Sequence, residues 1–557
     1  MATQRLPYER LRVGVLVLPL LFLLLFYFYP LGTILFRSLL VADQATLPSL
    51  GYVLRVLWFT TWQAALSTVL TLALGLPGAH VLARYRFPGK SVLQALTTVP
   101  FVLPTLIVST AFLSLIGPNG TVNDLVTRLW GASAPQIDMR HTVWIILLAH
   151  VFYNYSVVLR IVGGFWEGIH PNLDEAARTL GANRWQAWFK VILPQLMPAI
   201  AAAALLTFLF CFTSFGVIVV LGGPRFATLE VEIYRQTAQL LNLPVAAILS
   251  IVQLVITFAV TSAYTAMQRR TARPLQRQSR ESLQHLPRSN RERLWIAANV
   301  LCMVTLLLAP LGALVWRSLT LGGRLSLQHY AALWQGDERS LFAVSPLVAT
   351  RNSLLFAVVA VALALVLGTL GAYALSSKGG RGHRLLAWLD PVLVLPLGTS
   401  AVTLGFGYLI AFGRRPMNWI TSPAMIPIAH ALLAFPFVLR SVLAALRSIQ
   451  PSIREAAAAL GARPLEVWWR VDVPLIAGPL AVGAAFAFAI SVGEFGATLL
   501  ITRPEYATLP VMLYRYLAQP GLSNAGQALA MSVLLMGLCT ISLVLVERFR
   551  GTQTDAF

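Results

Sequence analysis

Residues 175–182 read Glu-Ala-Ala-Arg-Thr-Leu-Gly-Ala, and residues 455–462 read Glu-Ala-Ala-Ala-Ala-Leu-Gly-Ala. The two stretches begin 455 − 175 = 280 residues apart, and much of the surrounding sequence repeats at the same separation. Matching pairs are Ala149-His150 with Ala429-His430, Arg160 with Arg440, Pro194 with Pro474, Phe215-Gly216 with Phe495-Gly496, and Ala227-Thr228-Leu229 with Ala507-Thr508-Leu509. A constant offset over so many positions indicates that the second half of the chain is a copy of the first.

The two copies differ in the length of one connection. Gly75 and Gly78 match Gly368 and Gly371 at a larger separation, 368 − 75 = 293 residues. The first copy therefore has 293 − 280 = 13 additional residues between these landmarks. We expect them in the outer connection 117–140, which corresponds to the shorter connection 413–424 of the second copy.

The composition is that of a chain surrounded by lipid. Of the 557 residues, 57% are hydrophobic and 11% are charged, whereas soluble domains average about 25% charged residues. The apolar blocks are long enough to cross the hydrocarbon core as helices, which pair every backbone group internally. We predict an all-α membrane protein with 12 transmembrane helices in two parallel six-helix repeats. The predicted spans are 13–36, 56–80, 92–116, 142–164, 197–221, 244–266, 294–316, 352–375, 387–412, 425–445, 477–501 and 523–546.

The formal net charge of +21 follows this topology. Most Lys and Arg residues fall in the N-terminus, in the connections after even-numbered spans and in the C-terminal tail. Such an excess marks the cytoplasmic side, so both termini are predicted to be cytoplasmic and no nucleic-acid partner is expected. The block 13–36 is longer than a signal-peptide core and has no cleavage site after it, so it is predicted to be an uncleaved first helix.

No pattern in the sequence is typical of catalysis or of metal binding. The cysteines Cys211, Cys302 and Cys539 lie in apolar blocks without paired spacing, which argues against disulfides and metal clusters. No nucleophile stands beside a placed base. The chain also lacks the GxxxxGK[ST] phosphate loop of an ATPase. We expect no catalytic residues, no metal and no cofactor, and a separate ATPase if ATP is the energy source.

Both copies have a patterned connection after their fourth span. Residues 174–181 combine good helix formers with an acidic first turn, and Gly181 suits a left-handed helix cap. A second amphipathic stretch with aromatic residues follows, and Pro194 precedes the return to the membrane. The second copy repeats this pattern between Ile453 and Pro474.

This pattern resembles the EAA loop of binding-protein-dependent ABC importer permeases, and the resemblance extends over nearly the whole chain. It implies the type I ABC importer permease fold in a bacterial cytoplasmic (inner) membrane. It also implies that each loop is a coupling helix docking on an ABC ATPase subunit, two copies in all, and that an extracytoplasmic solute-binding protein is a further partner. The implied coupling residues are Glu175, Ala176, Ala177, Gly181, Glu455, Ala456, Ala457 and Gly461. Asp472 departs from the family pattern, which usually has an apolar residue there.

The two-copy form is similar to the permeases of thiamine and ferric-iron importers. Residues 215–216, 222–224 and 227–234 resemble the thiamine type. Residues 493–498 are also similar to molybdate-type and iron-type permeases. The resemblance therefore implies thiamine or ferric iron as the solute without choosing between them.

Two alternative interpretations remain open at this point. The loops could lie on the membrane interface, with Trp188, Trp468 and Trp469 as anchors. The 12 spans would also fit a major-facilitator-like secondary transporter. Repeated docking loops after spans four and ten have no role in a secondary transporter, so the importer is favoured.

Glu494 is the most informative charge inside a predicted span. A buried carboxylate costs at least ~2.5 kcal/mol on insertion scales, so either a function or a partner is expected. It could line the pathway of a cationic solute together with its counterpart Ser214, or it could form a structural pair or cap a helix end. His150 and His430 are expected to pack or to form hydrogen bonds. Asp390 is expected at the cytoplasmic edge near Arg384, in a structural role.

We divide the chain into a first permease repeat (1–266, loop 166–196), a cytoplasmic linker (267–293) and a second repeat (294–557, loop 446–476). The linker contains eight Arg and little apolar sequence. The outer connections 225–235 and 503–515 carry mixed charges that suit docking of a binding protein, and solvated loops would fit them equally.

Overall fold

A computed structural model describes residues 6–40, 48–131, 133–170, 172–223, 225–271, 284–335, 344–376, 389–413 and 418–554. Within these residues the regular structure is helical apart from two short paired strands, β1 (Thr320–Leu321) and β2 (Arg324–Leu325), and one isolated bridge between Tyr85 and His285. The all-α prediction is confirmed. The part of the linker between 272 and 283, together with Pro224 and Arg384, lies outside the described residues.

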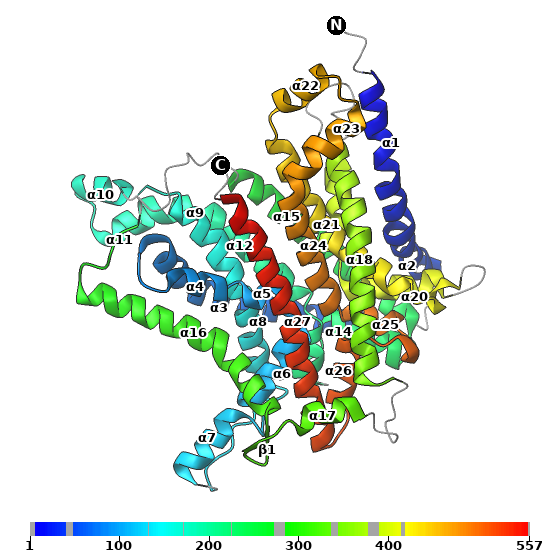
Figure 1. Cartoon of the computed structure of the whole chain (residues 1–557). Helices are drawn as coiled ribbons and strands as arrows, with labels where there is room; N and C mark the ends of the chain where they lie inside the picture. The colour runs from blue at the N-terminus through cyan, green and yellow to red at the C-terminus, as the bar shows by residue number, and fades with distance from the viewer. Residues whose placement is uncertain are drawn as a thin grey trace. The chain divides into compact units, whose positions relative to one another are not determined.

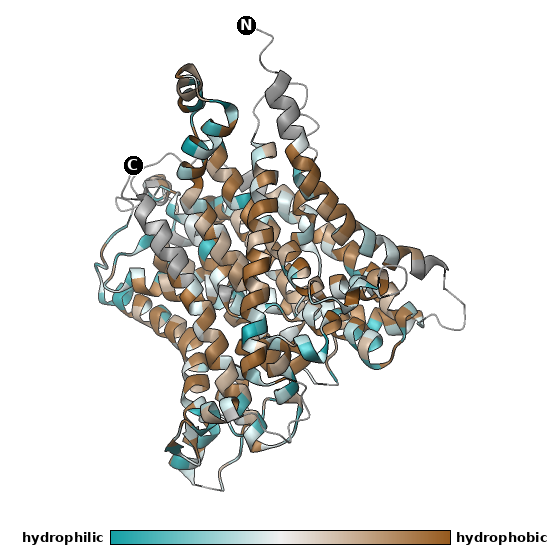
Figure 2. Cartoon of the chain, turned by 45° about the vertical axis from the view of Figure 1, so that its right-hand side comes forward, coloured by the Kyte–Doolittle hydropathy of each residue, from teal (hydrophilic) through white to brown (hydrophobic). Residues whose placement is uncertain are grey.

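Eleven helices are long and apolar enough to cross a membrane, and a bent pair brings the number to 12. Figure 2 shows the long helices coloured as hydrophobic over most of their length, with hydrophilic residues mainly near their ends. The bent pair, 389–398 with 401–412, turns by 99° at the predicted ninth span. The other candidates are Gly14–Phe36, Leu50–Arg84, Thr105–Trp130, Val143–Glu167, Trp185–Phe212, Leu243–Met267, Asn290–Ser318, Pro346–Leu375, Met425–Ser448, Pro464–Gly493 and Leu522–Ser542.

The chain packs as two compact units. One comprises residues 48–232 and 249–326, and the other comprises residues 1–47, 233–248 and 327–557. Figure 1 labels the helices of both units.

The unit formed by 48–232 and 249–326 contains most of the first copy. Its helices are α3 (Leu50–Arg84), α4 (Lys90–Leu96), α5 (Val99–Val102), α6 (Thr105–Ile116), α7 (Thr121–Trp130), α8 (Val143–Val158), α9 (Gly164–Glu167), α10 (Asn172–Thr179), α11 (Arg184–Ala187), α12 (Leu193–Phe212), α13 (Gly216–Leu221) and α16 (Asn290–Ser318), together with most of α14 (Leu229–Tyr234) and α15 (Leu243–Thr271). Two π-helical segments, η3 (Leu159–Gly163) and η4 (Trp188–Ile192), continue its long helices.

The other unit contains most of the second copy. Its helices are α1 (Leu6–Leu23), η1 (Leu24–Phe28), α2 (Tyr29–Leu40), η5 (Arg235–Gln239), α17 (Gln328–Gln335), α18 (Pro346–Leu375), η7 (Leu395–Gly398), α20 (Ala401–Phe412), η8 (Trp419–Thr421), α21 (Met425–Ser448), α22 (Pro451–Ala459), α23 (Pro464–Val467), η9 (Trp468–Asp472), α24 (Val473–Gly493), α25 (Gly496–Ile501), η10 (Pro504–Tyr506), α26 (Leu509–Ala518) and α27 (Leu522–Thr554).

The first helix of each copy packs on the body of the opposite copy. In the unit of α18–α27, the Tyr27 hydroxyl lies 2.5 Å from the Thr399 hydroxyl, and the rings of Phe26 and Phe412 are 5.9 Å apart. In the other unit α16 packs against α6 and α3, and Met303 joins the buried cluster formed around α3 and α8. The boundaries of the two compact units are therefore set by helix packing, and they differ from the boundaries of the two sequence repeats.

Matched glycines allow the second and fourth spans of each copy to approach closely. A Cβ on Gly75 would lie 2.7 Å from a methyl carbon of Val158, and one on Gly368 would lie 2.7 Å from the same methyl carbon of Val438. Val438 is the counterpart of Val158 at the 280-residue offset. Small residues at such contacts let helix backbones pack tightly in a membrane protein. The repeat found in the sequence thus extends to individual packing contacts.

The fifth and eleventh spans, Trp185–Phe212 and Pro464–Gly493, begin and end earlier than predicted, because each helix breaks before the predicted end. The predicted span 197–221 divides into α12, which ends at Phe212, and the short helix α13. The predicted span 477–501 divides into α24, which ends at Gly493, and the short helix α25. Each short helix packs on the third span of its own copy: α13 packs on α6, and α25 packs on α20. That contact requires the chain to turn away from the axis of the long helix.

Candidate functional site

The two patterned loops fold alike. The first contains α10 and α11, and the second contains α22 and α23 (Figure 1). Gly181 has a φ of 90° and Gly461 has a φ of 88°. Ala182 N–H donates to Ala177 O at 3.0 Å, and the matching bond from Ala462 to Ala457 is 3.1 Å long. This six-to-one bond with a left-handed glycine is the Schellman helix ending, so the predicted glycine caps are confirmed in both copies.

The predicted coupling residues occupy different faces of these short helices. Ala177 is buried and Ala457 half-buried, so this position packs toward the rest of the loop. Ala176, Ala456 and Glu455 are exposed. The backbone of Glu175 lies in α10, and its side chain is outside the described residues.

The second helix of each loop begins with a backbone N–H bonded to the side chain three residues later, and in the first loop the bond is reciprocated. Gln186 N–H donates to Asn183 Oδ1 at 2.8 Å, and Asn183 N–H donates to Gln186 Oε1 at 3.0 Å. In the second copy Arg463 N–H donates to Glu466 Oε2 at 2.8 Å. A side chain at N3 that accepts from the N-cap backbone satisfies an N–H group that the helix itself leaves unpaired.

The aromatic residues of the loops divide into a packed group and an exposed group. The Trp188 ring lies 5.4 Å from Trp166, and the Trp468 ring lies 4.7 Å from Tyr373. These two tryptophans are half-buried and pack against aromatic residues of neighbouring helices. Trp469 is exposed, as the interface interpretation requires.

Both loops carry an exposed apolar face at matching positions. Leu180 is 88% exposed and Leu460 is 89% exposed. The face also contains Trp185 and Phe189 in the first copy, and Leu465 and Trp469 in the second. Exposed apolar clusters of this kind mark surfaces that contact a protein or a membrane. The exposed apolar residues thus repeat at the same 280-residue offset as the loops themselves.

Asp472, the departure from the family pattern, has a specific partner. Its side chain is 3% exposed and accepts a hydrogen bond from Arg454 Nε at 2.7 Å. Arg454 lies on α22, beside Glu455. The acid therefore links the loop helix to the start of α24.

Glu494 caps the short helix α25. Its carboxylate accepts N–H bonds from Ala497 at 2.8 Å and from Thr498 at 3.0 Å, and it also accepts the Thr498 hydroxyl. His430 Nε2 lies 3.3 Å from Glu494 Oε2. Backbone donors at a helix start stabilise an anion because they carry the positive end of the helix dipole. The sequence left open whether Glu494 lines a pathway or has a structural role. The contacts of its carboxylate are those of a helix cap.

The first copy has no carboxylate at this break. The counterpart of Glu494 is Ser214, which is buried in the turn before α13. His150, the counterpart of His430, lies 3.0 Å from Ser67 Oγ through its Nδ1 atom. Both histidines therefore form hydrogen bonds, as expected from their matched positions, but with partners from different elements.

Two buried acids lie where the sequence predicts an outer loop. Glu230 and Glu232 lie on α14, within the segment interpreted as an outer loop, and both are buried. Gln253 Nε2 donates to Glu230 Oε1 at 2.5 Å, and the Tyr52 hydroxyl donates to Glu232. In the sequence, the alternation of these acids with Leu229, Val231 and Ile233 is the pattern that could have indicated a packed segment.

The solvated-loop interpretation is wrong for most of both outer segments. Leu229 N–H donates to Thr60 Oγ1 at 3.0 Å, and its counterpart Leu509 donates to Ser353 Oγ at 2.7 Å. Ser353 matches Thr60 at the 293-residue offset. The exposed residues of the two segments are Arg225, Arg235 and Arg503–Glu505. Asp390 pairs with Arg440 at 3.0 Å, in keeping with the structural role expected for it.

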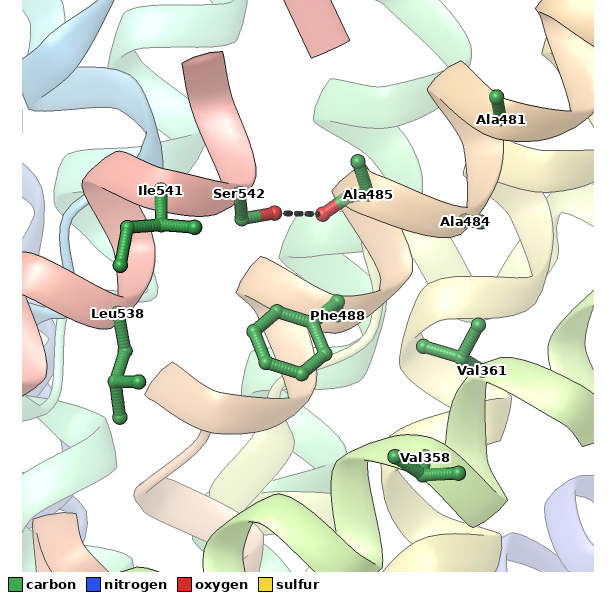
Figure 3. A pocket seen from close by; sticks show the side chains of 9 residues that line it. All are labelled: Val358, Val361, Ala481, Ala484, Ala485, Phe488, Leu538, Ile541 and Ser542. Carbon is green, nitrogen blue, oxygen red and sulfur yellow. Dashed lines mark hydrogen bonds between the residues drawn. The ribbon is translucent and has the colours of Figure 1, made fainter. Parts of the chain in front are cut away.

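A groove of about 410 Å³ lies in the unit of the second copy, between α18, α24 and α27. Figure 3 shows its lining: Val358, Val361, Ala481, Ala484, Ala485, Phe488, Leu538, Ile541 and Ser542. The Ser542 hydroxyl donates to Ala485 O at 2.8 Å. The groove therefore suits an apolar group and contains neither Glu494 nor Ser214. Within the described residues no group of three or more His, Cys, Asp or Glu side chains could hold a metal ion.

The many apolar helices and the repeated loops define a polytopic transport subunit built from two copies of one domain. The family of binding-protein-dependent transport system inner membrane components matches residues 72–273 and 365–550, and the chain belongs to this family. It is therefore a multi-pass permease subunit of an ABC importer of the bacterial inner membrane, and it is not the subunit that hydrolyses ATP. The secondary-transporter alternative is set aside.

The chain is similar to relatives that are named for two solutes. The thiamine transport system permease protein ThiP of Brucella abortus (strain 2308) is 26% identical over 512 residues, which cover 91% of this chain and 89% of the relative. ThiP of Salmonella typhimurium (strain LT2) is 28% identical over 522 residues, 91% of each chain. The ferric transport system permease protein FbpB of Actinobacillus pleuropneumoniae is 26% identical over 497 residues, 84% of this chain and 68% of the relative.

Proposed function

We propose that the loops 166–196 and 446–476 are the docking sites of two ABC ATPase subunits. The observation that carries the proposal is the repeated exposed apolar face, which includes Leu180 and Leu460. In this assignment the coupling residues are those predicted from the sequence. Exposed Ala456 and Glu455 give the partner a shallow surface with one charge, and a carboxylate at this place can pair with a basic side chain.

This assignment also sets the topology. The docking loops, both termini and the linker 267–293 lie in the cytoplasm, and the repeats 1–266 and 294–557 each contribute six spans. The distribution of Lys and Arg supports this orientation. The exposed tips Arg225 and Arg503–Glu505 lie on the opposite side, where they receive an extracytoplasmic solute-binding protein through complementary charges.

Thiamine is the solute that we favour. The support is the match over 91% of this chain to two thiamine permeases, compared with 84% for the ferric permease. Ferric iron is the second candidate. We place the solute pathway beside the breaks that contain Ser214 and Glu494, because irregular backbone at membrane depth is tolerated where it borders a cavity. Glu494 then acts through α25, whose start it holds.

The docking proposal is tested by co-purification. The tagged chain is extracted from membranes of its host, and bound ATPase subunits are identified and counted by mass spectrometry. Two ATPase copies are expected per chain, and Glu175→Lys with Glu455→Lys should release them. Glu505→Lys, an exposed charge reversal in an outer connection, is the matched control. Full retention of the ATPase by the double variant would contradict the proposal.

The solute is tested separately. Cells that lack the chain are given labelled thiamine or labelled ferric citrate, and uptake is compared with and without the restored protein. Uptake of thiamine alone supports the favoured solute, and uptake of iron alone selects the second candidate.

A further inference from the structure

The second loop contains an ion pair that the first loop cannot form. Arg454 Nε donates to Asp472 Oδ1 at 2.7 Å, and the Asp472 side chain is almost completely buried. The residues at the same positions in the first copy, 280 residues earlier, are Asp174 and Ile192. Since Ile192 carries no charge, the two loops differ in how they are attached.

The pair joins two elements that have different tasks. Arg454 belongs to α22, which carries Glu455 and Ala456. Asp472 ends the π-helical turn η9, and α24 begins at the next residue. The bond therefore connects the docking helix directly with the base of a membrane helix. In its absence the connection would run through Gly461, the short helix α23 and the packing of α22 on η9.

Stability alone does not account for the pair. An apolar pair of similar size is often as stable as a buried ion pair, and the first copy uses Ile192 at this place. Moreover, Arg454 Nη2 is buried and has no hydrogen-bond partner among the described residues, which is unfavourable. What a charge-assisted hydrogen bond adds is a defined distance and direction between its two elements.

We propose that Arg454 and Asp472 are positioning residues that fix α22 to the start of α24. Displacement of the second loop is then passed to α24 through this bond, whereas the first loop has Asp174 and Ile192 at these positions and transmits displacement through other contacts, which include the packing of α10 on η4. This inference rests on the proposed docking of ATPase subunits. It assigns unequal mechanical roles to two loops that look alike in sequence.

The test measures hydrogen exchange in the permease–ATPase complex in nanodiscs. The protection of amides 453–460 in the wild type should exceed that of amides 173–180 on the order of tenfold, after correction for intrinsic rates. Arg454→Asp with Asp472→Ile installs the residues of the first copy. This double variant should lower protection of α22 to that of α10 while the ATPase subunits stay bound.

A readout of transmission separates positioning from simple stabilisation. In the wild type, ATP with vanadate should change exchange in residues 475–483, at the start of α24. The response should disappear in the double variant and return in the charge-swapped variant, Arg454→Asp with Asp472→Arg. The matched control is Asp174→Arg with Ile192→Asp, which should raise protection of α10.

Equal protection of the two wild-type loops, or an unchanged nucleotide response in the double variant, would overturn the inference. If the double variant does not fold, the wild-type comparison and the charge-swapped variant decide, and a swapped variant without the response counts against the pair. Loss of the ATPase subunits from the wild type itself would instead refute the docking proposal.

Discussion

The Nε2 atom of His430 lies 3.3 Å from the Oε2 atom of Glu494, at the point where the eleventh span breaks. The other imidazole nitrogen, Nδ1, lies 2.7 Å from Ser491 Oγ. Glu494 in turn holds the start of α25 through two backbone N–H groups. The break is thus organised by one acid and one histidine.

Glu494→Gln should destabilise the protein. The amide keeps one acceptor oxygen but presents N–H groups to a site that consists of donors, and a buried unsatisfied group costs about 1–3 kcal/mol. We expect a lower melting temperature in detergent, measured by intrinsic fluorescence. Ser214→Ala, at the matching position, should change it little. An unchanged melting temperature with lost uptake would instead favour a direct role in the pathway.

Gly75→Ala and Gly368→Ala should each destabilise the packing of the second span on the fourth. The new methyl group would meet Val158 or Val438 at 2.7 Å, and overpacking costs about 1–3 kcal/mol. Val158→Ala should partly rescue Gly75→Ala. Gly312→Ala is the control, because nothing lies within 4 Å of its Cβ position. Size-exclusion chromatography after heating measures the loss, and equal survival of all variants would refute the close contact.

Leu180→Ser with Leu460→Ser should weaken ATPase docking without unfolding the chain. Both side chains are almost fully exposed in the isolated protein, so their removal costs no internal packing. Removal of a buried apolar anchor at an interface typically costs at least ~1 kcal/mol, or more than fivefold in affinity. Titration of the ATPase onto nanodisc-bound permease measures the change. The control is Leu522→Ser, a leucine outside the loops that is 79% exposed. Similar losses in both variants would argue against a specific anchor.

Gly181→Ala and Gly461→Ala should each loosen their loop. Both glycines adopt a left-handed conformation, with φ of 90° and 88°, which costs an L-residue about 1–2 kcal/mol. Asparagine tolerates this region better, so Gly181→Asn should be milder. Limited proteolysis of the loops measures the effect. Gly164→Ala, in a helix with open space around it, should behave like the wild type.

Much of the fold was predictable, because the length of apolar blocks and the repetition of residues are visible in the chain without knowledge of its tertiary contacts. The apolar blocks predicted the spans, and the repeated Gly181 and Gly461 predicted the helix caps. The breaks at 213–215 and 494–495 were not predicted, since the residues around them remain apolar. Glu494 marked its break as unusual but did not show that its partners are Ala497, Thr498 and His430. Those contacts depend on the direction in which the chain turns.

What the sequence determined by itself was the class of structure: two copies of a helical membrane domain, each with one patterned loop, because long apolar blocks cross lipid as helices and a constant offset reveals duplication. Tertiary structure decided the pairings. It placed the first helix of each copy on the opposite copy's body, buried Glu230 and Glu232 in a segment that reads as a loop, and joined Arg454 to Asp472. These pairings arise from packing and from the need to satisfy buried charges, and both depend on residues that are distant in sequence.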